Sequence, residues 1–400
     1  MNLLIADKLE DEAVRALGAL PGVKVRFEPG ITKDALGAAL ADVDVLVVRS
    51  KEVRAPALAA GKRLALVVRA GAGTNTIDVA EASARGIYVA NCPGKNAVAV
   101  AELAIGLMLA LDRRLVEATG ALRSGRWEKG EFGKAQGIFG RTLGIAGFGN
   151  IGREVAVRGR ALGLKVAAWS RSLTPERARE QGVVFAPSLE ALAAQVDILS
   201  LHLALTPDTR GAVDARVLAG MKPGAMLINT ARAEVLDYQA LEDGVRQRGL
   251  RAGLDVFPDE PAGSNASYSH PLLALGSVVA SPHIGASTAQ AQMAIADEVV
   301  RIVKSFVERG SVPGCVNLAA HTPARCQLIV RHFDKVGVLA SVLQVIKQHG
   351  INVEDMVSTP FDGHRAAVAR LSLGAFPSAA CVAEIEQSGP EVIQVDAIAV

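Results

Sequence analysis

The 400-residue chain is poor in cysteine. Its four cysteines lie far apart and include no Cys-x-x-Cys pair; they are Cys92, Cys315, Cys326 and Cys381. This spacing favours reduced thiols in a cytoplasmic protein over a disulfide framework or a zinc site. We therefore expect neither a structural metal nor a covalent cross-link in this fold.

Net charge is also scarce, because 43 basic and 41 acidic side chains leave a formal charge of only +2. The two signs are interspersed along the chain, so there is no basic stripe for nucleic acid and no acidic tail. With 50% hydrophobic and 21% charged residues, the composition is that of an ordinary folded protein. Small anions that bind local groups of cations remain compatible with it.

Long apolar runs are absent as well. The longest, residues 97–111, contains Glu102 and is shorter than the roughly 20 residues that a membrane-spanning helix needs. The first residues, MNLLIADKLEDEAV, have too short an apolar part, and acids too early, for a signal peptide. We expect residues 97–111 to form a buried helix and the protein to have no membrane partner.

Residues 143–152, LGIAGFGNIG, are the most informative segment that is present. An apolar strand leads into Gly147-x-Gly149-x-x-Gly152, and a helical pattern follows. Gly147 allows a tight turn, Gly149 lets the backbone approach a pyrophosphate, and Gly152 lets the helix pack close to its strand. Because the next strand follows at residues 165–169, the segment predicts a dinucleotide site rather than an ordinary glycine-rich turn.

The acidic residue that usually binds the ribose 2′-hydroxyl, roughly 20 residues beyond the glycines, is missing. The sequence there reads Trp169-Ser170-Arg171-Ser172. A guanidinium beside a hydroxyl suits a 2′-phosphate, which makes NADP an alternative to NAD. Equally, Arg171 is a solvated loop cation if backbone groups hold the ribose.

Short apolar runs alternate with helical patterns along most of the chain, which predicts βαβ units and parallel sheets. We expect an α/β fold with two doubly wound domains, a flavodoxin-like one and a Rossmann one. The last part reads βαββαβ, a ferredoxin-like arrangement with a hairpin turn at Asp362-Gly363. The expected division is residues 1–95 with 284–312, residues 96–283, a linker at 313–324, and residues 325–400.

Three segments that follow strands of the second domain carry side chains suited to chemistry: Arg232, Glu260 and His283. Ligands of open α/β sheets lie beyond the carboxyl ends of strands, so these groups can converge on one site. Singly, each has a plain structural reading as a surface ion pair, a helix-start acid or a loop histidine. As a trio they indicate function.

These segments, with the glycine turn and the runs RAGAGTNTIDV, AELAIGLMLAL and SPHIGAST, resemble the D-isomer-specific 2-hydroxyacid dehydrogenase family over residues 1 to about 310. The carboxyl-terminal unit resembles an ACT domain. The resemblance implies hydride transfer between C2 of a 2-hydroxy acid and a nicotinamide. His283 would be the acid/base, held by Glu260, and Arg232 would bind the substrate carboxylate. Ala233, where the family usually has glycine, adds only a methyl group.

The resemblance also implies further contacts. For the substrate carboxylate they are backbone amides of Ala70, Gly71, Ala72 and Gly73, and the side chain of Asn96. For the cofactor they are Gly147, Phe148, Gly149, Asn150, Ile151, Gly152, Ser170, Arg171, His202, Thr206, Thr230, Ala231, Asp255 and Gly285. Asp255 would accept a hydrogen bond from the nicotinamide carboxamide and fix which ring face is offered.

A cation cluster, Arg49-Ser50-Lys51 with Arg69, predicts binding of a phosphate. Together with the family resemblance, this cluster implies 3-phosphoglycerate and 3-phosphohydroxypyruvate, in serine synthesis, as the substrate pair. The plain alternative is surface charge at a strand end. The other functions that the sequence leaves open are an NADPH-dependent reductase of glyoxylate or hydroxypyruvate, and a non-catalytic NAD(P)-binding co-regulator. The intact Arg232, Glu260 and His283 argue against the co-regulator.

The ACT-like unit predicts an effector site. By the resemblance, L-serine would contact His332, Asp334 and Asn352, with subunits paired into a homodimer or homotetramer. Asp334 departs from the asparagine often found there, which leaves the identity of the effector open. The alternative is that the unit only joins subunits through its sheet edges.

Overall fold

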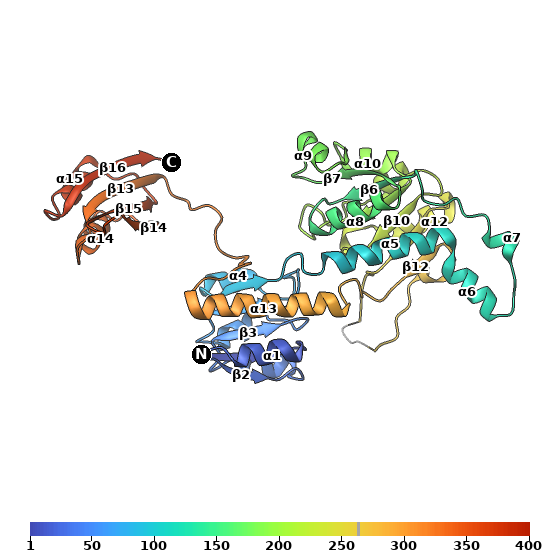
Figure 1. Cartoon of the computed structure of the whole chain (residues 1–400), viewed down its shortest axis with the longest axis horizontal. Coiled ribbons are helices and arrows are strands. Elements are labelled where there is room, and N and C mark those ends of the chain that lie inside the picture. Colours follow the sequence, from blue (N-terminus) through green and yellow to red (C-terminus); the bar gives the residue numbers. More distant parts are fainter. Residues whose placement is uncertain (262–264) are drawn as a thin grey trace. The chain divides into compact units, whose positions relative to one another are not determined.

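The chain divides into two units, residues 1–317 and 318–400, in the computed structural model, which describes residues 1–261 and 265–400 (Figure 1). The first unit contains two parallel sheets and the second an antiparallel sheet. The predicted α/β fold with parallel sheets is confirmed for the first unit. No helix in the described part of the chain is long and apolar enough to cross a membrane.

A five-stranded parallel sheet forms at the amino terminus, in the order β2-β1-β3-β4-β5. Its inner strands carry short runs of valine, leucine and isoleucine that are buried on both faces, as parallel strands between helices require, whereas the edge strand Lys24–Phe27 is partly exposed. The strands are β1 (Asn2–Ile5), β2 (Lys24–Phe27), β3 (Val45–Val48), β4 (Leu66–Arg69) and β5 (Tyr88–Asn91).

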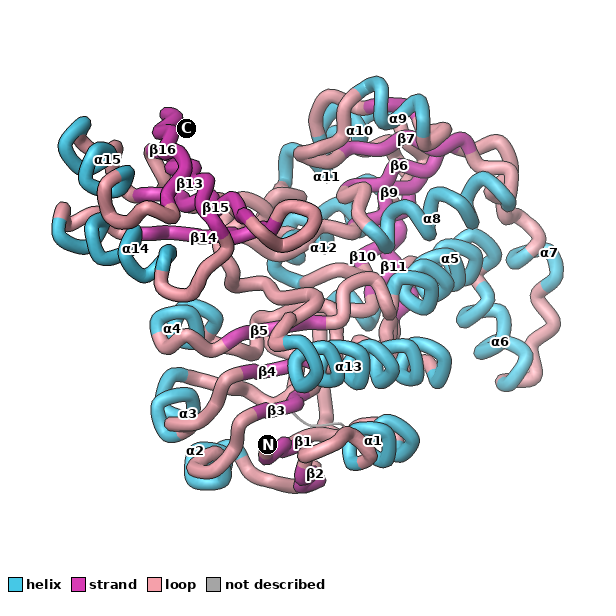
Figure 2. Tube along the Cα trace, turned by 60° about the vertical axis from the view of Figure 1, so that its left-hand side comes forward, coloured by secondary structure: helices cyan, strands magenta, loops and turns pink. Residues whose placement is uncertain are grey.

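Helices cover both faces of this sheet (Figure 2). One face packs against α2, α3 and α4, and the other against α1 and the late helix α13, whose Ile295, Val299 and Ile302 enter the core. A segment close to residue 300 therefore completes a domain built from the first hundred residues. The helices are α1 (Asp11–Gly18), α2 (Lys33–Ala39), α3 (Ala55–Ala60), α4 (Val79–Ala84) and α13 (Ala289–Arg309).

The second parallel sheet has seven strands in the order β12-β11-β10-β9-β6-β7-β8. Two-residue β8 was not predicted, and Asp255 directly follows β11. The strands are β6 (Thr142–Ala146), β7 (Lys165–Trp169), β8 (Val184–Phe185), β9 (Ile198–Leu201), β10 (Met226–Asn229), β11 (Arg251–Leu254) and β12 (Val278–Ala280).

One face of this sheet packs against α5, α8 and α9, and the other against α10, α11 and α12. Two further helices, α6 and α7, follow α5. Helix α5 is the buried helix expected at 97–111. The bounds are α5 (Ala97–Arg113), α6 (Leu115–Arg123), α7 (Lys129–Phe132), α8 (Asn150–Ala161), α9 (Pro175–Glu180), α10 (Leu189–Gln195), α11 (Ala215–Gly220) and α12 (Tyr238–Arg248), with 3₁₀ turns η1 (Ala233–Val235) and η2 (Pro271–Ala274).

The first residues of the expected linker belong to the first sheet. The Asn91 amide donates to the Gly314 carbonyl, and the Val316 amide donates to the Val89 carbonyl. The Asn317 side chain accepts from the Val89 amide at 2.8 Å and donates to the Ile87 carbonyl at 2.8 Å. The connection to the second unit thus begins at Leu318, later than the expected residue 313.

The second unit is a βαββαβ structure, as the pattern predicted. Its sheet has the order β14-β15-β13-β16. Its helices cover one face of the sheet, where Leu328, Val342 and Leu371 are buried. The elements are β13 (Cys326–Phe333), α14 (Val338–Gln348), β14 (Val353–Pro360), β15 (Ala366–Leu373), α15 (Ala379–Glu386) and β16 (Val392–Ala399).

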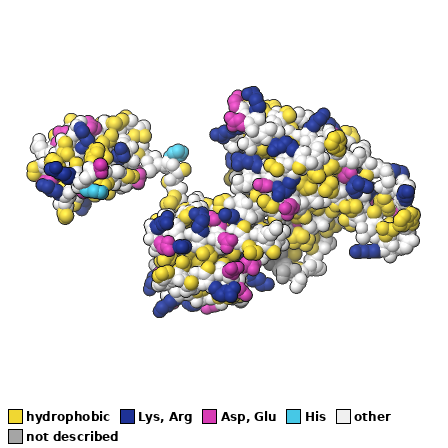
Figure 3. Space-filling view, viewed as in Figure 1, with side chains coloured by type: hydrophobic (Ala, Val, Ile, Leu, Met, Phe, Trp, Pro, Cys, Tyr) yellow, Lys and Arg dark blue, Asp and Glu magenta, His cyan; other side chains and the backbone are white. Residues whose placement is uncertain are grey.

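On the face of the molecule seen in Figure 3, acidic and basic side chains are intermingled.

Candidate active site

The strand orders place two ligand-binding positions in the first unit. In the seven-stranded sheet the order reverses between β6 and β9, where the glycine turn follows β6. In the five-stranded sheet it reverses between β1 and β3, and Arg49 directly follows β3. Such switch points open a crevice at the carboxyl ends of the strands.

The glycine turn has the geometry that a pyrophosphate requires. Gly147 has φ +97°, and a Cβ there would lie 2.5 Å from the His202 carbonyl oxygen. A Cβ at Gly152 would lie 2.2 Å from the Gly147 carbonyl oxygen. Around Gly149 the described structure leaves open space, which is the side from which a ligand can approach.

Polar atoms near this turn are left for a ligand. His202 Nδ1 and Thr230 Oγ1, after β9 and β10, are buried without a partner among the described residues. His202 Nε2 lies 2.8 Å from Ser200 Oγ, and burial lowers the pKa of His202 to about 3, so the ring is neutral. Buried polar atoms are rarely left unpaired, so these residues fit a dinucleotide.

Other expected cofactor residues are placed around the turn. Phe148 is buried, Asn150 and Ile151 begin α8, and Ala231 donates its amide to Asn229 Oδ1 at 3.0 Å. Thr206 lies in the loop after β9, and Ser170 and Arg171 follow β7.

Asp255 and Gly285, which were expected to contact the cofactor, bond to each other and to neighbouring residues. Asp255 is 1% exposed, and its carboxylate accepts hydrogen bonds from Ser281 Oγ at 2.6 Å and from the amides of Ile284 and Gly285 at 2.9 Å. The Gly285 amide is therefore already used. Here Asp255 holds the loop that carries His283, a role its sequence position did not reveal.

His283 and Glu260 form the predicted pair. His283 Nδ1 lies 2.6 Å from Glu260 Oε2, and Glu260 Oε1 accepts from the Phe257 amide at 2.9 Å. Burial acts to raise the pKa of Glu260, but the bonds from His283 and Phe257 and the charge of Arg232 outweigh it, and the pKa lies below its usual value. Glu260 is thus an ionised acceptor that orients the imidazole.

An aromatic cluster, absent from the sequence predictions, supports the Glu260 loop. Phe257 packs against Tyr238, Tyr268 and His270, with ring centroids about 6 Å apart. Tyr268 Oη donates to the Pro258 carbonyl at 2.8 Å, and Tyr238 Oη donates to the Val256 carbonyl. These side chains fix the backbone on either side of Phe257.

Arginines from both sheets line a cleft of about 450 Å³ beside this pair. Arg69 folds over Gly71, where a Cβ would lie 1.8 Å from Arg69 Nη1, and Arg232 Nη2 would be 2.9 Å from a Cβ at Gly73. Burial, then the charges of Arg232 and Arg49, lower the pKa of Arg69 from its ordinary value, and Arg69 Nε is buried without a partner in the described chain. The cleft therefore fits an anion.

Only part of the expected amide site is available. The Ala70 amide donates to the Val48 carbonyl and the Gly71 amide to the Arg69 carbonyl. The amides of Ala72 and Gly73 have no partner in the described chain, which leaves them for a carboxylate. Asn96 precedes α5, and its side chain neither caps that helix nor lines the cleft.

The cation cluster at the end of β3 is arranged differently from the prediction. Asp7, missed by the sequence reasoning although it follows β1, accepts from the amides of Arg49, Ser50 and Lys51 at 2.8, 3.1 and 2.9 Å. Lys51 Nζ donates to the Ile31 carbonyl, and Lys51 does not line the cleft. Ser50 lines the cleft, whereas Arg49 Nη1 lies 3.4 Å from Gln292 Oε1 on α13.

The expected effector residues of the second unit do not present three free polar groups. His332 is 2% exposed, and its Nδ1 lies 2.8 Å from the Phe333 carbonyl oxygen. Asn352 Nδ2 donates to Glu354 Oε1 at 2.8 Å, while Asp334 is exposed. The β13 alternation places the ring on the helix-covered face, which differs from the expected contact with a bound amino acid.

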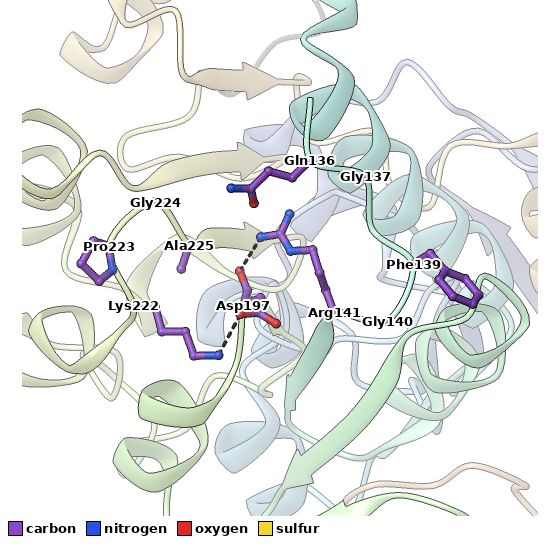
Figure 4. A pocket seen from close by; sticks show the side chains of 10 residues that line it. All are labelled: Gln136, Gly137, Phe139, Gly140, Arg141, Asp197, Lys222, Pro223, Gly224 and Ala225. Carbon is purple, nitrogen blue, oxygen red and sulfur yellow. Dashed lines mark hydrogen bonds and ion pairs between the residues drawn. The ribbon is translucent and has the colours of Figure 1, made fainter. Parts of the chain in front are cut away.

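Another cavity of similar size lies at the opposite, amino-terminal edge of the seven-stranded sheet (Figure 4). Its charged groups satisfy one another. Asp197 accepts from Lys222 Nζ at 2.7 Å and from the Thr142 amide at 2.8 Å, and Arg141 bonds to the Asp197 carbonyl and to buried Asp112. This network ties loops together and leaves no uncompensated charge for a ligand.

A dinucleotide site that opens beside an imidazole–carboxylate pair and an anion cleft is the arrangement of a dehydrogenase that exchanges hydride with a nicotinamide cofactor. Residues 105–285 match the family model of the D-isomer specific 2-hydroxyacid dehydrogenase, NAD binding domain. This chain belongs to the D-isomer-specific 2-hydroxyacid dehydrogenase family.

Similar proteins carry different names. The D-3-phosphoglycerate dehydrogenase of Mycobacterium leprae is 41% identical over 318 residues, which cover 79% of this chain and 58% of that protein. The hydroxypyruvate reductase of Thermotoga maritima is 42% identical over 76% of this chain and 97% of its own. The NAD⁺-bound 3-phosphoglycerate dehydrogenase of Entamoeba histolytica has a TM-score of 0.66 at 26% identity, over 80% of this chain and 99% of that one. The chain thus spans about three-fifths of the mycobacterial relative.

Proposed function

We propose that this protein is a D-3-phosphoglycerate dehydrogenase. It would oxidise the C2 hydroxyl of 3-phosphoglycerate with NAD(P) to give 3-phosphohydroxypyruvate, the first step of L-serine synthesis. The observation that carries the proposal is that Arg69 and Arg232 line one cleft with Ser50, while Arg49 follows the neighbouring strand β3; the charges of Arg232 and Arg49 both act to lower the pKa of Arg69. A substrate with a carboxylate at one end and a phosphate at the other would supply two anions to such a site.

The residues present can perform the proton and binding steps. When bound, the nicotinamide cofactor supplies the hydride acceptor at its ring. His283 Nδ1 is held by Glu260, which leaves Nε2 to take the proton from the C2 hydroxyl. Arg232 would bind the substrate carboxylate, with the free amides of Ala72 and Gly73 as further donors.

For the phosphate, Arg69 and Ser50 line the cleft, and Arg49 lies at the switch point of the first sheet. The amides of residues 49–51 already donate hydrogen bonds to Asp7, so side chains rather than backbone amides would make the phosphate contacts. The guanidinium geometry suits a phosphate because it donates two parallel hydrogen bonds.

Reduction of hydroxypyruvate or glyoxylate is the second candidate. Lys51 bonds to Ile31 away from the cleft, which removes one cation from the predicted phosphate site. In addition, the match to the T. maritima reductase covers 97% of that reductase. A non-catalytic role is disfavoured because the His283–Glu260 pair is assembled.

Initial rates distinguish oxidation of 3-phosphoglycerate from reduction of hydroxypyruvate or glyoxylate as the function. The full chain would be assayed with 3-phosphoglycerate, and in the reverse direction with 3-phosphohydroxypyruvate, hydroxypyruvate and glyoxylate, each with both nicotinamide cofactors. The proposal predicts a kcat/KM for 3-phosphohydroxypyruvate at least about tenfold above that for hydroxypyruvate, because one extra charge-assisted contact is worth about 1.5–3 kcal/mol. Equal values, or faster glyoxylate reduction, would establish the reductase instead.

We also propose that the second unit is an ACT-like regulatory domain and that the enzyme is a homodimer or homotetramer. The βαββαβ topology supports the first point. Exposed apolar side chains on and beside α6 and α7 support the second, since large exposed apolar groups mark contact surfaces. They include Leu115, Val116, Leu122, Trp127 (81% exposed) and Phe139 (87% exposed).

A further inference from the structure

We propose that Asp208 makes this enzyme select NAD over NADP. The carboxylate would supply, from a neighbouring loop, the negative charge that is missing at the end of β7. The inference rests on the cofactor domain alone and holds for any of the substrates considered above.

The first observation is where Arg171 points. Arg171 Nη1 lies 3.0 Å from Asp208 Oδ2, so the guanidinium that would bind a 2′-phosphate faces a carboxylate. The two side chains come from different loops, after β7 and after β9, whose strands flank β6 and its glycine turn. The ribose that carries the 2′-substituent binds beyond the end of β7 in such sheets.

The second observation is that the loop carrying Asp208 is fixed. Thr209 is buried, and its hydroxyl accepts from the Thr206 amide at 2.8 Å and donates to the Ala204 carbonyl at 2.6 Å. The Thr209 and Arg210 amides both donate to the Thr206 carbonyl at 3.1 Å. The turn therefore sets the position of Asp208 independently of its bond to Arg171.

The third observation concerns accessibility and strength. The side chains of Arg171 and Asp208 are 65% and 73% exposed, so a ligand can reach both. An exposed ion pair of this kind contributes little to stability, so the pair is not a structural necessity. Its charges are available to the cofactor.

These facts lead to opposite effects on the two cofactors. A 2′-phosphate beside Arg171 would meet the like charge of Asp208 and would have to compete with it for the guanidinium. A 2′-hydroxyl can instead donate a hydrogen bond to the carboxylate. Arg171 alone would indicate NADP, whereas the pair indicates NAD.

Binding measured without substrate tests the proposal. Calorimetric titrations of the full chain with NADH and with NADPH would compare the natural protein, Asp208→Asn, Arg171→Ala and the double variant. We expect NADH to bind the natural protein at least about tenfold more tightly than NADPH. Asp208→Asn should tighten NADPH by about five- to tenfold and change NADH by less than about threefold, as removal of one like charge at a solvated site requires.

The double variant isolates the pair. Arg171→Ala should weaken NADPH strongly in the Asp208→Asn background and only slightly in the natural protein. Glu308→Gln, which breaks an exposed ion pair with Lys304 on α13, is the matched control and should change neither affinity. The proposal is overturned if the natural protein binds NADPH as tightly as NADH, or if Asp208→Asn shifts both cofactors equally.

Discussion

At the scale of single residues, the position of His283 is set by its backbone as much as by its side chain. His283 has φ +53°, a left-handed conformation that few residues other than glycine adopt. Its amide donates to the Asp255 carbonyl at 2.8 Å, and the flanking amides and Ser281 bind the Asp255 carboxylate. The ring reaches Glu260 because hydrogen bonds to Asp255 fix the conformation of this loop.

Replacing His283 by Asn should lower kcat by about 10²- to 10⁴-fold, the contribution of a positioned general base. The affinity for NADH should change little, since the ring bonds to Glu260 rather than to the glycine turn. Steady-state rates and NADH titration measure the two effects. Near-normal turnover at neutral pH would assign the proton transfer to another group.

Replacing Glu260 by Gln should reduce stability only where the carboxylate is ionised. Its pKa in the folded state lies below the usual 4.5, so its stabilisation is present above that value and is lost as the pH falls through the folded pKa. We expect the variant to be less stable by about 1 kcal/mol or less at neutral pH, after screening of a partly exposed pair. Urea unfolding from about pH 7 to about pH 3.5 should show this difference shrinking; a constant difference would contradict it.

At the scale of elements, the loop after β3 shows how one carboxylate determines which groups face a site. Asp7 binds three consecutive amides, and this leaves the side chains of residues 49–51 to divide between the cleft, α13 and Ile31. Arg49 and Lys51, two positions apart in the sequence, therefore acquire different roles. The chain offers a matched pair of substitutions to demonstrate it.

Arg49→Ala should reduce kcat/KM for 3-phosphohydroxypyruvate by about 10- to 100-fold, the worth of a charge-assisted hydrogen bond. It should leave hydroxypyruvate within about threefold, because that molecule lacks the phosphate. Lys51→Ala should leave the ratio of the two substrates unchanged, since Lys51 bonds to Ile31. Equal losses on both substrates in Arg49→Ala would indicate a folding defect rather than a phosphate contact.

At the scale of the whole molecule, the first unit carries the cleft and the second unit forms a separate fold. The first unit brings side chains from the strand ends of both parallel sheets to one cleft, with Arg69 from one sheet and Arg232, Glu260 and His283 from the other. The second unit has its own core and sheet. Regulation by this unit requires that an effector bind the active and inhibited states with different affinities.

We expect millimolar L-serine to inhibit the full chain, and Asn352→Ala to abolish inhibition without lowering the uninhibited rate. Asn352 is exposed and bonds only to Glu354 among the described side chains, so it can exchange that partner for an amino acid. Glu386→Gln, at the end of α15, is a control that should leave inhibition intact. If calorimetry detects no binding of serine or glycine to the full chain, the second unit serves assembly alone.

The sequence by itself determined the parts of this protein that depend on local pattern. Alternating apolar runs predicted the strands, the glycines at 147, 149 and 152 predicted the dinucleotide turn, and the positions of Arg232, Glu260 and His283 after strands predicted one site. The structure places Arg232, Glu260 and His283 at one cleft, because strand ends of a parallel sheet share an edge, whatever the details of packing.

Only the tertiary structure decided which side chains meet. Asp7 and Arg49 are 42 residues apart, yet they join through an amide of the loop after β3. Arg171 and Asp208 are 37 residues apart and pair because β7 and β9 both flank β6. Lys51 turns to Ile31, and His332 turns inward. Side-chain direction depends on neighbours supplied by other elements, and sequence spacing carries no record of those neighbours.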